Sequence, residues 1–600
     1  MSTIDQQLEL ERKMSARGRE IYRANTEQAI EKGRGHETDA AQRLMREFIR
    51  VLAGKLEEWA HIRGPGMNGL GRPLLRAIDP HVAMYLALFC VFDHFTASTS
   101  LTSLAIKIGG MVEDDMRLQM FRDKHAAFYD EVMRDMKRKG VKNYGHKRRV
   151  LTFKANEKED EWPRWSVSDR AAVGMKLIDI IHENTDLVRK EHRRKKSGNR
   201  VLDVVTLEPT ESAARWMEEH HTMREMLYPE RLPCVIPPDD WTDIDQGGYY
   251  SAELRNTTKL IKTLNGAHRK YIRQNWHKKR KDWLTAVNAL QRTPWAVNTS
   301  VLAVIQEVWR KNLGIGIPAK DPLTPPPSPH PDVRVEDMTE QQKDAHDDWK
   351  SQATTVYTRE KERVAKSFQL SRILRLAADF SEYSEFWYVW TCDFRGRMYT
   401  STSGFSPQGP DVGKGLLQFA NGKQLGERGW YWLRVNMANR FGYDKENYDD
   451  RVKWVDAQHE RWIQAAEDPI GCRSVWSGAD KPYQFLATIF EYRDAMTSGD
   501  PRTFVSHLPV GLDGSCNGLQ NFSAMLRDNV GGTATNLVPA NKPADIYAEV
   551  GSVCGEKVRA RASQPTGDTD EDTRYQQWQR FIACYGNNGA IPRKMAKRPV

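Results

Sequence analysis

The sequence has few cysteines and no cysteine pair of metal-binding spacing. Seven cysteines are scattered through 600 residues, and no two of them form a Cys-x-x-Cys pair. Neither a zinc site nor a disulfide framework is therefore indicated, and a reducing cytoplasm suits such a chain.

Long apolar runs and targeting segments are also missing. The most apolar stretch, residues 82–92, is too short to cross a bilayer. The first residues form no secretory signal, and Glu9 and Glu11 make them more acidic than a typical transit peptide. We therefore expect a cytoplasmic location and no membrane partner.

Charged residues of both signs are abundant, with a small excess of positive charge. The 90 lysines and arginines outnumber the 80 aspartates and glutamates, which gives a formal net charge of +10. This excess favours a polyanionic partner such as nucleic acid, although many basic proteins bind none. A length of 600 residues is enough for several domains.

The most informative stretch runs from Leu508 to Asp528. It opens with an apolar run that predicts a short buried strand, followed by Asp513 at the strand's end and Gly514 in a tight turn. Apolar residues then recur at helical spacing, at Leu519, Phe522, Met525 and Leu526. Such a strand, turn and helix would hold a carboxylate rigidly at the rim of a sheet, which suits a divalent metal ion. The local pattern is equally typical of an ordinary Asp-Gly turn.

The residues of this stretch resemble motif A of the single-subunit, phage-type DNA-dependent RNA polymerases. The resemblance covers DGSCNGLQNFSA, from Asp513 to Ala524. It implies a two-metal mechanism in which Asp513 ligates two Mg²⁺ ions and the Gly514 carbonyl is a further ligand. Related DNA polymerases place a glutamate where Gly518 stands, and that glutamate crowds the 2′ position of the sugar. Gly518 therefore implies synthesis of RNA, although a glycine also suits a helix start.

A second element of the family stands near the end of the chain. Arg593 and Lys597 are spaced to share one helix face, and they match the R-x-x-x-K start of motif B, whose cations hold the incoming triphosphate. Arg598 and Tyr547 are predicted to bind nucleotide or RNA as well. The second catalytic aspartate of the family would lie beyond residue 600. We therefore expect either a truncated sequence or a split gene whose second polypeptide supplies the rest.

Two more matches to the family lie between residues 393 and 417. Asp393, Gly396 and Arg397 match a D-x-x-G-R element, and Lys414 follows a matching Ser-Pro-Gln-Gly segment. A fixed arginine at this point can grip the sugar-phosphate backbone near the growing end, and Lys414 is predicted to contact nucleotide or RNA. The alternative for the first element is an Asp–Arg pair that braces a strand end.

Two basic segments in the first third of the chain are candidate DNA contacts. The glycine-rich segment 62–73 is either a connector or, as the resemblance implies, a loop whose Arg63 and Arg72 read the minor groove of promoter DNA. Segment 187–205 predicts a β-hairpin with its tip at 198–199. It is either solvated or, as the resemblance implies, a wedge that opens the promoter. The residues predicted to contact DNA there are Arg193, Arg194, Lys195, Lys196 and Val201.

The expected fold is multidomain α+β and predominantly helical, with the right-hand polymerase architecture of the family. The predicted regions are a helical N-terminal promoter-binding domain (1–316), a proline-rich linker and thumb (317–384), a palm with an antiparallel sheet in two parts (385–422 and 504–541), a palm insertion (423–503), and the start of the fingers with a partial motif B (542–600). The long helical pattern after residue 337 is expected to continue to about residue 380.

The predicted function is that of a DNA-directed RNA polymerase working in the cytoplasm of a bacterial host during phage infection. Its partners would be duplex promoter DNA, the template strand, the nascent RNA and nucleoside triphosphates. Two other classes stay open. One is a DNA polymerase of the same superfamily, which Gly518 and the long N-terminal region disfavour. The other is a non-catalytic DNA-binding fragment of a split polymerase.

Overall fold

The computed structural model describes residues 3–62, 71–97, 99–138, 144–157, 164–197, 200–225, 229–263, 265–278, 282–333, 337–511, 514, 516–564, 567, 569–585, 590–591 and 595. Within these ranges the protein is predominantly helical with small sheets, as the sequence predicts. The chain divides into two compact units. We call them the N-terminal unit (Glu9–Glu230 and Ala252–Thr257) and the C-terminal unit (Met1–Leu8, Arg231–Ser251 and Thr258–Val600).

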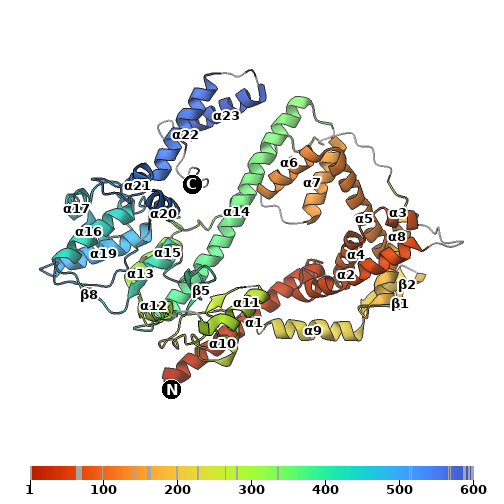
Figure 1. Ribbon diagram of the computed structural model, residues 1–600, viewed down its shortest axis with the longest axis horizontal. Helices are drawn as coiled ribbons and strands as arrows, with labels where there is room; N and C mark the ends of the chain where they lie inside the picture. Colours follow the sequence, from red (N-terminus) through yellow and green to blue (C-terminus); the bar gives the residue numbers. More distant parts are fainter. Residues whose placement is uncertain are drawn as a thin grey trace. The chain divides into compact units, whose positions relative to one another are not determined.

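The N-terminal unit is built from helices and one hairpin, all labelled in Figure 1 apart from a short 3₁₀ turn. The helices are α1 (Thr3–Glu31, whose first residues belong to the other unit), α2 (Asp39–His61), α3 (Arg72–Arg76), α4 (Pro80–Ala97), α5 (Leu101–Lys124), α6 (Ala126–Arg138), α7 (Tyr144–Glu157), α8 (Val167–Asn184), α9 (Glu211–Glu225) and α10 (Ala252–Thr257). Helix α2 is amphipathic, and its Leu44, Leu52 and Leu56 are buried.

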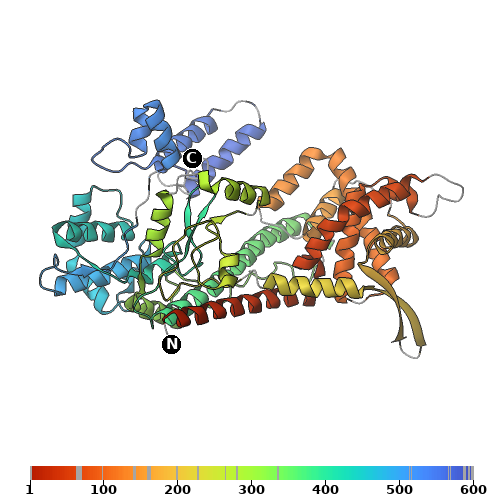
Figure 2. The ribbon, with the colours of Figure 1, turned by 60° about the horizontal axis from the view of Figure 1, so that its bottom comes forward.

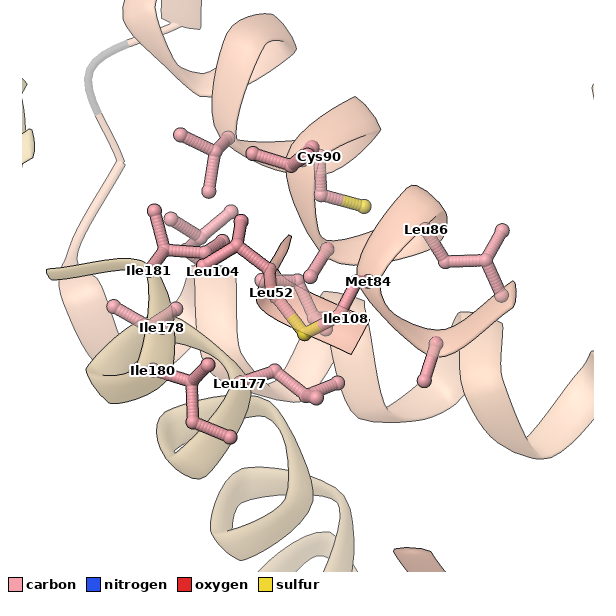
Figure 3. Close-up of a cluster of buried hydrophobic side chains, with 14 of the residues drawn as sticks. Leu52, Met84, Leu86, Cys90, Leu104, Ile108, Leu177, Ile178, Ile180 and Ile181 are labelled. Carbon is pink, nitrogen blue, oxygen red and sulfur yellow. The ribbon is translucent and has the colours of Figure 1, made fainter. Parts of the chain in front are cut away.

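A large apolar core joins α2, α4, α5 and α8. Figure 3 shows part of it, with Leu52 of α2, Met84 of α4, Leu104 and Ile108 of α5, and Leu177 of α8. Two glycines let α5 and α8 approach closely. A Cβ on Gly109 would overlap the carbonyl oxygen of Arg170, and a Cβ on Gly174 would overlap that of Ala105. The shape of the core therefore depends on two residues that have no side chain.

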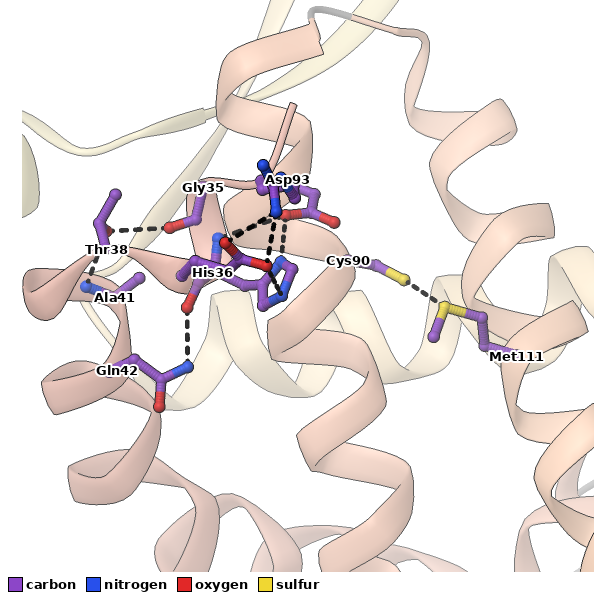
Figure 4. A network of polar contacts seen from close by, with 10 residues as sticks. Gly35, His36, Thr38, Ala41, Gln42, Cys90, Asp93 and Met111 are labelled. Atoms are coloured by element: carbon purple, nitrogen blue, oxygen red, sulfur yellow. Dashed lines mark hydrogen bonds and ion pairs between the residues drawn. The ribbon is translucent and has the colours of Figure 1, made fainter. Parts of the chain in front are cut away.

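Polar contacts fix the short segment before α2 against α4 (Figure 4). The Asp93 carboxylate accepts from the backbone N–H of His36 and lies 2.6 Å from its Nδ1. The Thr38 hydroxyl accepts from the N–H of Ala41 and caps α2. Burial raises the pKa of the neighbouring Cys90 thiol to about 12, so that this cysteine is a packing residue.

The predicted hairpin is present. Strands β1 (Val188–Ser197) and β2 (Arg200–Pro209) pair antiparallel from Val188 opposite Pro209 to Ser197 opposite Arg200. Figure 2 shows them as a ribbon that extends beyond the helices of the unit. Its base is anchored, because Val188 and Leu207 are buried in the core and the N–H of Thr210 donates to the Leu187 carbonyl. The backbone of the basic segment is thus held in one register.

The C-terminal unit combines several helices with three small sheets. Its helices are α11 (Gly266–Asn275), α12 (Asp282–Gln291), α13 (Thr299–Arg310), α14 (Glu340–Phe380), α15 (Asp411–Gly415), α16 (Gly426–Phe441), α17 (Tyr448–Asp456), α18 (His459–Glu467), α19 (Pro482–Thr497), α20 (Asn517–Leu526), α21 (Asn529–Ala534), α22 (Ile546–Ala562) and α23 (Thr569–Tyr585). Its strands are β3 (Ile261–Lys262), β4 (Trp295–Val297), β5 (Trp390–Asp393), β6 (Met398–Thr400), β7 (Leu417–Phe419), β8 (Lys423–Gln424) and β9 (Val505–Ser506). Strand β5 lies between β3 and β6, while β4 pairs with β7 and β8 with β9.

The long helix predicted after residue 337 is α14, which Figure 1 shows as a single continuous helix. A capping box begins it, because the Thr339 side chain accepts from the Gln342 N–H and the Gln342 side chain accepts from that of Thr339. The proline-rich segment before it is extended and lies along α14. The Trp349 indole donates to the Pro326 carbonyl at 2.7 Å, and the Glu360 carboxylate accepts from the N–H of Leu323.

The predicted palm insertion consists of α16 to α19, which pack through aromatic side chains. Trp462 of α18 and Phe485 of α19 are buried and meet edge to face, with ring centroids 5.6 Å apart. Aromatic pairs of this kind contribute beyond the apolar area that they bury. The insertion therefore has a rigid core beside the segment that leads to Asp513.

Candidate active site

The segment that leads to Asp513 begins at β9. The predicted strand over residues 508–510 is wrong, because the strand is Val505–Ser506 and residues 507–511 form no regular element. Val510 is 69% exposed rather than buried. Pro509 explains the early end of the strand, since proline has no N–H for a ladder hydrogen bond.

Hydrogen bonds replace the missing strand and hold this segment to α19 and β7. The half-buried Glu491 carboxylate of α19 accepts from the Ser506 hydroxyl at 2.5 Å and from the His507 N–H at 2.8 Å. The Nδ1 of His507 lies 2.8 Å from the Phe419 carbonyl oxygen, which can only accept, so Nδ1 carries the proton. Burial raises the pKa of Glu491, and the two hydrogen bonds act in the opposite direction.

Helix α20 follows Asp513 as predicted, although Asp513 itself lies outside the described residues. Gly514, the other predicted metal ligand, is exposed, and a Cβ there would overlap the side-chain oxygen of Asn517. Cys516 at the N-cap has a positive φ of 61°. Gly518 lies in the first turn of α20, and a Cβ added there would meet nothing within 4 Å among the described residues. The turn is thus crowded at Gly514 and open at Gly518.

The apolar side chains that predicted α20 do not form a buried face in the described part of the chain. Phe522, Met525 and Leu526 are 60%, 77% and 75% exposed. The periodicity therefore identified the helix correctly, but these side chains pack against no core formed by the described residues.

Beside the segment at 508–511, α15 and α19 meet in close contact. A Cβ on Gly415 would lie 2.8 Å from the Cβ of Tyr483, so that only glycine fits there. The Asp411 carboxylate accepts from the backbone N–H groups of Tyr483 and Gln484, at 2.9 and 3.3 Å, and from the Gln484 side chain at 2.9 Å. Lys481, the N-cap residue of α19, provides no side-chain cap. Asp411 therefore caps α19 from another helix.

These elements border a cleft of about 170 Å³. Lys414 of α15 lines it, as do Arg440 of α16 and the backbone segment from Leu508 to Gly511. Lys414 is a residue that the sequence predicts to contact nucleotide or RNA, and the structure brings it to the entrance of the Asp513 segment. Asp411 and Arg440 were missed by the sequence analysis. For Asp411, a proline before an aspartate at a helix start is a weak sequence signal of a capping role. For Arg440, the sequence contains no signal.

The predicted D-x-x-G-R element is the turn between β5 and β6. The Asp393 carboxylate accepts from the N–H groups of Arg395 and Arg397, both at 2.9 Å, and Gly396 has a φ of +86°. The Arg397 side chain is exposed. Asp393 therefore braces the strand end by backbone contacts, while Arg397 stays accessible to a ligand. Tyr547, another predicted binding residue, lies half-buried in the first turn of α22.

The candidate DNA contacts of the N-terminal unit differ in their surroundings. Arg72 is only 5% exposed; its guanidinium lies 4.3 Å from the ring centre of Trp59 and donates to the Ile62 carbonyl. In the structure Arg72 holds the end of α2 through these two contacts. Its contact with DNA stays a prediction. On the hairpin, Lys190 pairs with Asp179 at 2.8 Å, and Arg189 pairs with Glu191 and Glu208.

Several predicted site residues cannot be located. For the hairpin residues Arg193, Arg194, Lys195, Lys196 and Val201, the structure describes the backbone but not the side chains. The following lie outside the described residues altogether: Arg63, Asp513, Arg593, Lys597 and Arg598. The described residues contain no group of three or more histidine, cysteine or acidic side chains that could hold a metal ion. No helix within the described ranges has the length and apolarity that a membrane crossing requires.

Comparisons with known proteins give one consistent result. The family model for the N-terminal region of DNA-directed RNA polymerase matches residues 6–292, and the model for DNA-dependent RNA polymerase matches residues 423–600. T7 RNA polymerase of Escherichia phage T7 is 30% identical over 95% of this chain and 64% of its own length. The DNA-directed RNA polymerase of Enterobacteria phage T3 is 29% identical over the same shares.

A plant protein is similar as well. The chloroplastic/mitochondrial DNA-directed RNA polymerase 2 of Nicotiana sylvestris is 27% identical over 80% of this chain and 48% of its own length. This chain therefore spans 64% of the length of the two phage proteins. The comparisons give no support to the predicted second polypeptide.

Proposed function

This chain belongs to the single-subunit, phage-type family of DNA-dependent RNA polymerases, and on that premise we propose that it synthesises RNA from nucleoside triphosphates on a DNA template. The observation that carries the proposal is the DGSCNGLQNFSA segment, which lies within the family match over residues 423–600 and continues into α20. The substrates would be the template strand and the four triphosphates, and the product RNA. The phage origin of two relatives supports a site of action in the cytoplasm of a bacterial host.

The proposed metal ligands are the Asp513 carboxylate and the Gly514 carbonyl. Both are hard oxygen donors of the kind that Mg²⁺ prefers, but one carboxylate and one carbonyl supply only part of the ligands that two Mg²⁺ ions would need. A second carboxylate, substrate phosphates and water would supply the rest. Bound Mg²⁺ would activate the 3′-hydroxyl and stabilise the displaced pyrophosphate. The contribution of the protein is to fix these oxygens, and the hydrogen bonds of Glu491 and His507 do this for the backbone that precedes Asp513.

Further residues are proposed to bind phosphate groups of the substrate and the growing strand. Arg593, Lys597 and Arg598 would neutralise the negative charge of the triphosphate. Negative charge builds up on the leaving pyrophosphate in the transition state, so cations that contact it there lower the activation barrier. Arg397, which is exposed beside a braced turn, would hold the backbone of the growing strand. Lys414 and Tyr547 would contact nucleotide or RNA.

We assign promoter binding to residues 1–316 and nucleotide transfer to the remainder. The hairpin supports the first assignment, because its first antiparallel strand carries the basic residues 193–196. The 41-residue helix α14 is suited to a thumb, α16–α19 to a palm insertion, and α22 with α23 to the start of the fingers. Arg63 and Arg72 stay candidates for upstream DNA contacts, with Arg72 acting through the fold of α2.

An Asp513→Asn variant tests the function. It keeps the shape of the side chain and removes the charge that would bind Mg²⁺, so RNA synthesis on a promoter template should fall to a small fraction of the wild-type rate while DNA binding persists. Asp528→Asn is the matched control, because Asp528 caps α21 through its side chain and asparagine caps equally well. Substantial incorporation by Asp513→Asn would contradict the assignment. DNA binding without any incorporation by the wild-type protein would favour a non-catalytic DNA-binding role.

A further inference from the structure

The cleft beside the Asp513 segment has the character of an anion site. Its polar lining consists of two cations, two amides and one hydroxyl, supplied by Lys414, Arg440, Asn436, Gln484 and Thr488. No lining residue is a carboxylate. At a volume of about 170 Å³ it has room for a tetrahedral anion with a few water molecules, since one water molecule needs about 10–15 Å³ of such a cavity.

Arg440 is the unusual member of this lining. It lies near the end of α16 and is half-buried, and burial lowers the pKa of its guanidinium while the nearby Asp411 acts in the opposite direction. Yet no side chain in the described part of the chain accepts a hydrogen bond from it or forms an ion pair with it. By contrast, Arg434 on the same helix pairs with Asp456 at 2.7 Å. A partly desolvated cation without an acidic partner is costly unless an anion reaches it.

The position of Arg440 connects it to the active-site segment. A Cβ built on Gly511 would lie 3.2 Å from its Nη2, so the guanidinium lies against the backbone two residues before Asp513. Lys414 approaches the same cleft from α15, whose place is set by the contact of Asp411 with α19. Two cations on separate, packed helices thus face one space at the entrance to the catalytic segment.

We propose that Arg440, together with Lys414, binds a phosphate group of the strand or nucleotide on which the Asp513 site acts. This inference rests on the proposed function and adds a residue to it. An arginine is suited to the task because its planar guanidinium holds a phosphate through two parallel N–H donors, while a lysine adds a point charge. The bound phosphate supplies the acidic partner that Arg440 lacks within the described protein.

The test compares Arg440→Gln with Arg428→Gln. Both remove one arginine from α16, but Arg428 is exposed in the first turn and does not line the cleft. The probe is a fluorescent ten-nucleotide RNA with a 5′-hydroxyl, and its affinity for the purified protein is measured at several salt concentrations. Arg440→Gln should weaken binding about tenfold or more. The slope of log affinity against log salt should fall by about 0.7 for each lost phosphate contact.

Three further measurements make the outcome decisive. Lys414→Gln, an exposed change that should not disturb folding, should reduce the slope similarly, and Arg440→Lys should keep part of the affinity. Inorganic tripolyphosphate as a competitor separates the sources. If it displaces the RNA from the wild type and less effectively from Arg440→Gln, the cleft takes free phosphates; equal competition with both indicates the RNA backbone. Equal slopes for Arg440→Gln, Arg428→Gln and the wild type would overturn the proposal.

The failure of this inference is distinguishable from failure of the proposed function. Asp513→Asn should abolish incorporation and leave RNA affinity and its salt slope unchanged. If the wild type incorporates nucleotides but its RNA affinity does not depend on Arg440, only the proposed phosphate binding in the cleft is refuted. A wild type that never incorporates but shows the Arg440-dependent slope refutes only the polymerase activity.

Discussion

Replacement of Asp411 by asparagine should loosen the start of α19, the helix that forms one wall of the cleft. The carboxylate accepts three hydrogen bonds there, two of them from backbone N–H groups that have no partner within the helix. Asparagine keeps one oxygen and presents an NH₂ group where the second oxygen accepted. Its neutral side chain also loses the attraction to the positive end of the helix dipole.

The expected cost is about 1–2 kcal/mol, because asparagine keeps one capping oxygen but loses a charge-assisted hydrogen bond and the attraction to the helix dipole. Amide hydrogen exchange in a peptide that covers residues 482–490 should therefore become about 5–30 times faster. Local exchange is the appropriate assay, because a chain with two compact units does not unfold in one step.

The matched control is Glu427→Gln, an acid-to-amide change in the first turn of α16. Glu427 is exposed and pairs with Arg502 at 2.7 Å, so its loss should cost less than about 1 kcal/mol. Exchange in α19 should stay at the wild-type rate in this control. Unchanged exchange in Asp411→Asn, or equal acceleration in the control, would refute the view that Asp411 caps α19 from α15.

The remaining predictions concern the helix packing, the hairpin and the sugar. Gly109→Ala should destabilise the N-terminal unit by about 1–3 kcal/mol in thermal unfolding because its methyl group would overlap the Arg170 carbonyl. Gly110→Ala, whose Cβ has only an arginine methylene at 4.0 Å, should be neutral or stabilising, and the reverse order would refute the packing argument. Replacement of residues 193–201 by a Gly-Ser turn should impair initiation on closed duplex promoters much more than on a premelted bubble, and equal loss on both would exclude a melting role. Gly518→Glu should lower the ratio of ribonucleotide to deoxyribonucleotide incorporation in a folded protein, and an unchanged ratio would remove the steric argument.

Local patterns predicted those elements whose signals lie close together in the sequence. The capping residues Thr339 and Gln342 stand three positions apart, and the long helical pattern after them became α14. The hairpin was predicted from two β-prone arms around a Gly-Asn tip, and the register confirms the pairing of those arms. In both cases the information needed for the element lies within the element itself.

The features that the sequence could not predict depend on residues far apart in the chain. Asp411 caps a helix that starts more than seventy residues later, and no local preference of a five-residue helix indicates that contact. Arg440 lies near the end of α16, and its contact with the backbone at Gly511 can be recognised only in the folded structure. The strand expected at 508–510 is absent for a related reason. A strand needs a neighbouring strand to pair with, and an apolar run in the sequence does not show whether one is present. Pro509 has no N–H to donate to such a neighbour.

The glycines of the Asp513 segment differ in how much room the structure leaves for a side chain. A Cβ at Gly511 would meet the Arg440 guanidinium at 3.2 Å and one at Gly514 would overlap the Asn517 side-chain oxygen, so a larger residue at either position requires a neighbouring side chain to move. Gly518 has open space around its missing Cβ among the described residues, and a side chain in the first turn of α20 would fit the fold. An acidic side chain there would even favour the helix, since it would lie near the positive end of the helix dipole. Because described packing does not require glycine at this position, a loss of sugar preference in Gly518→Glu would report on the substrate and not on a damaged fold.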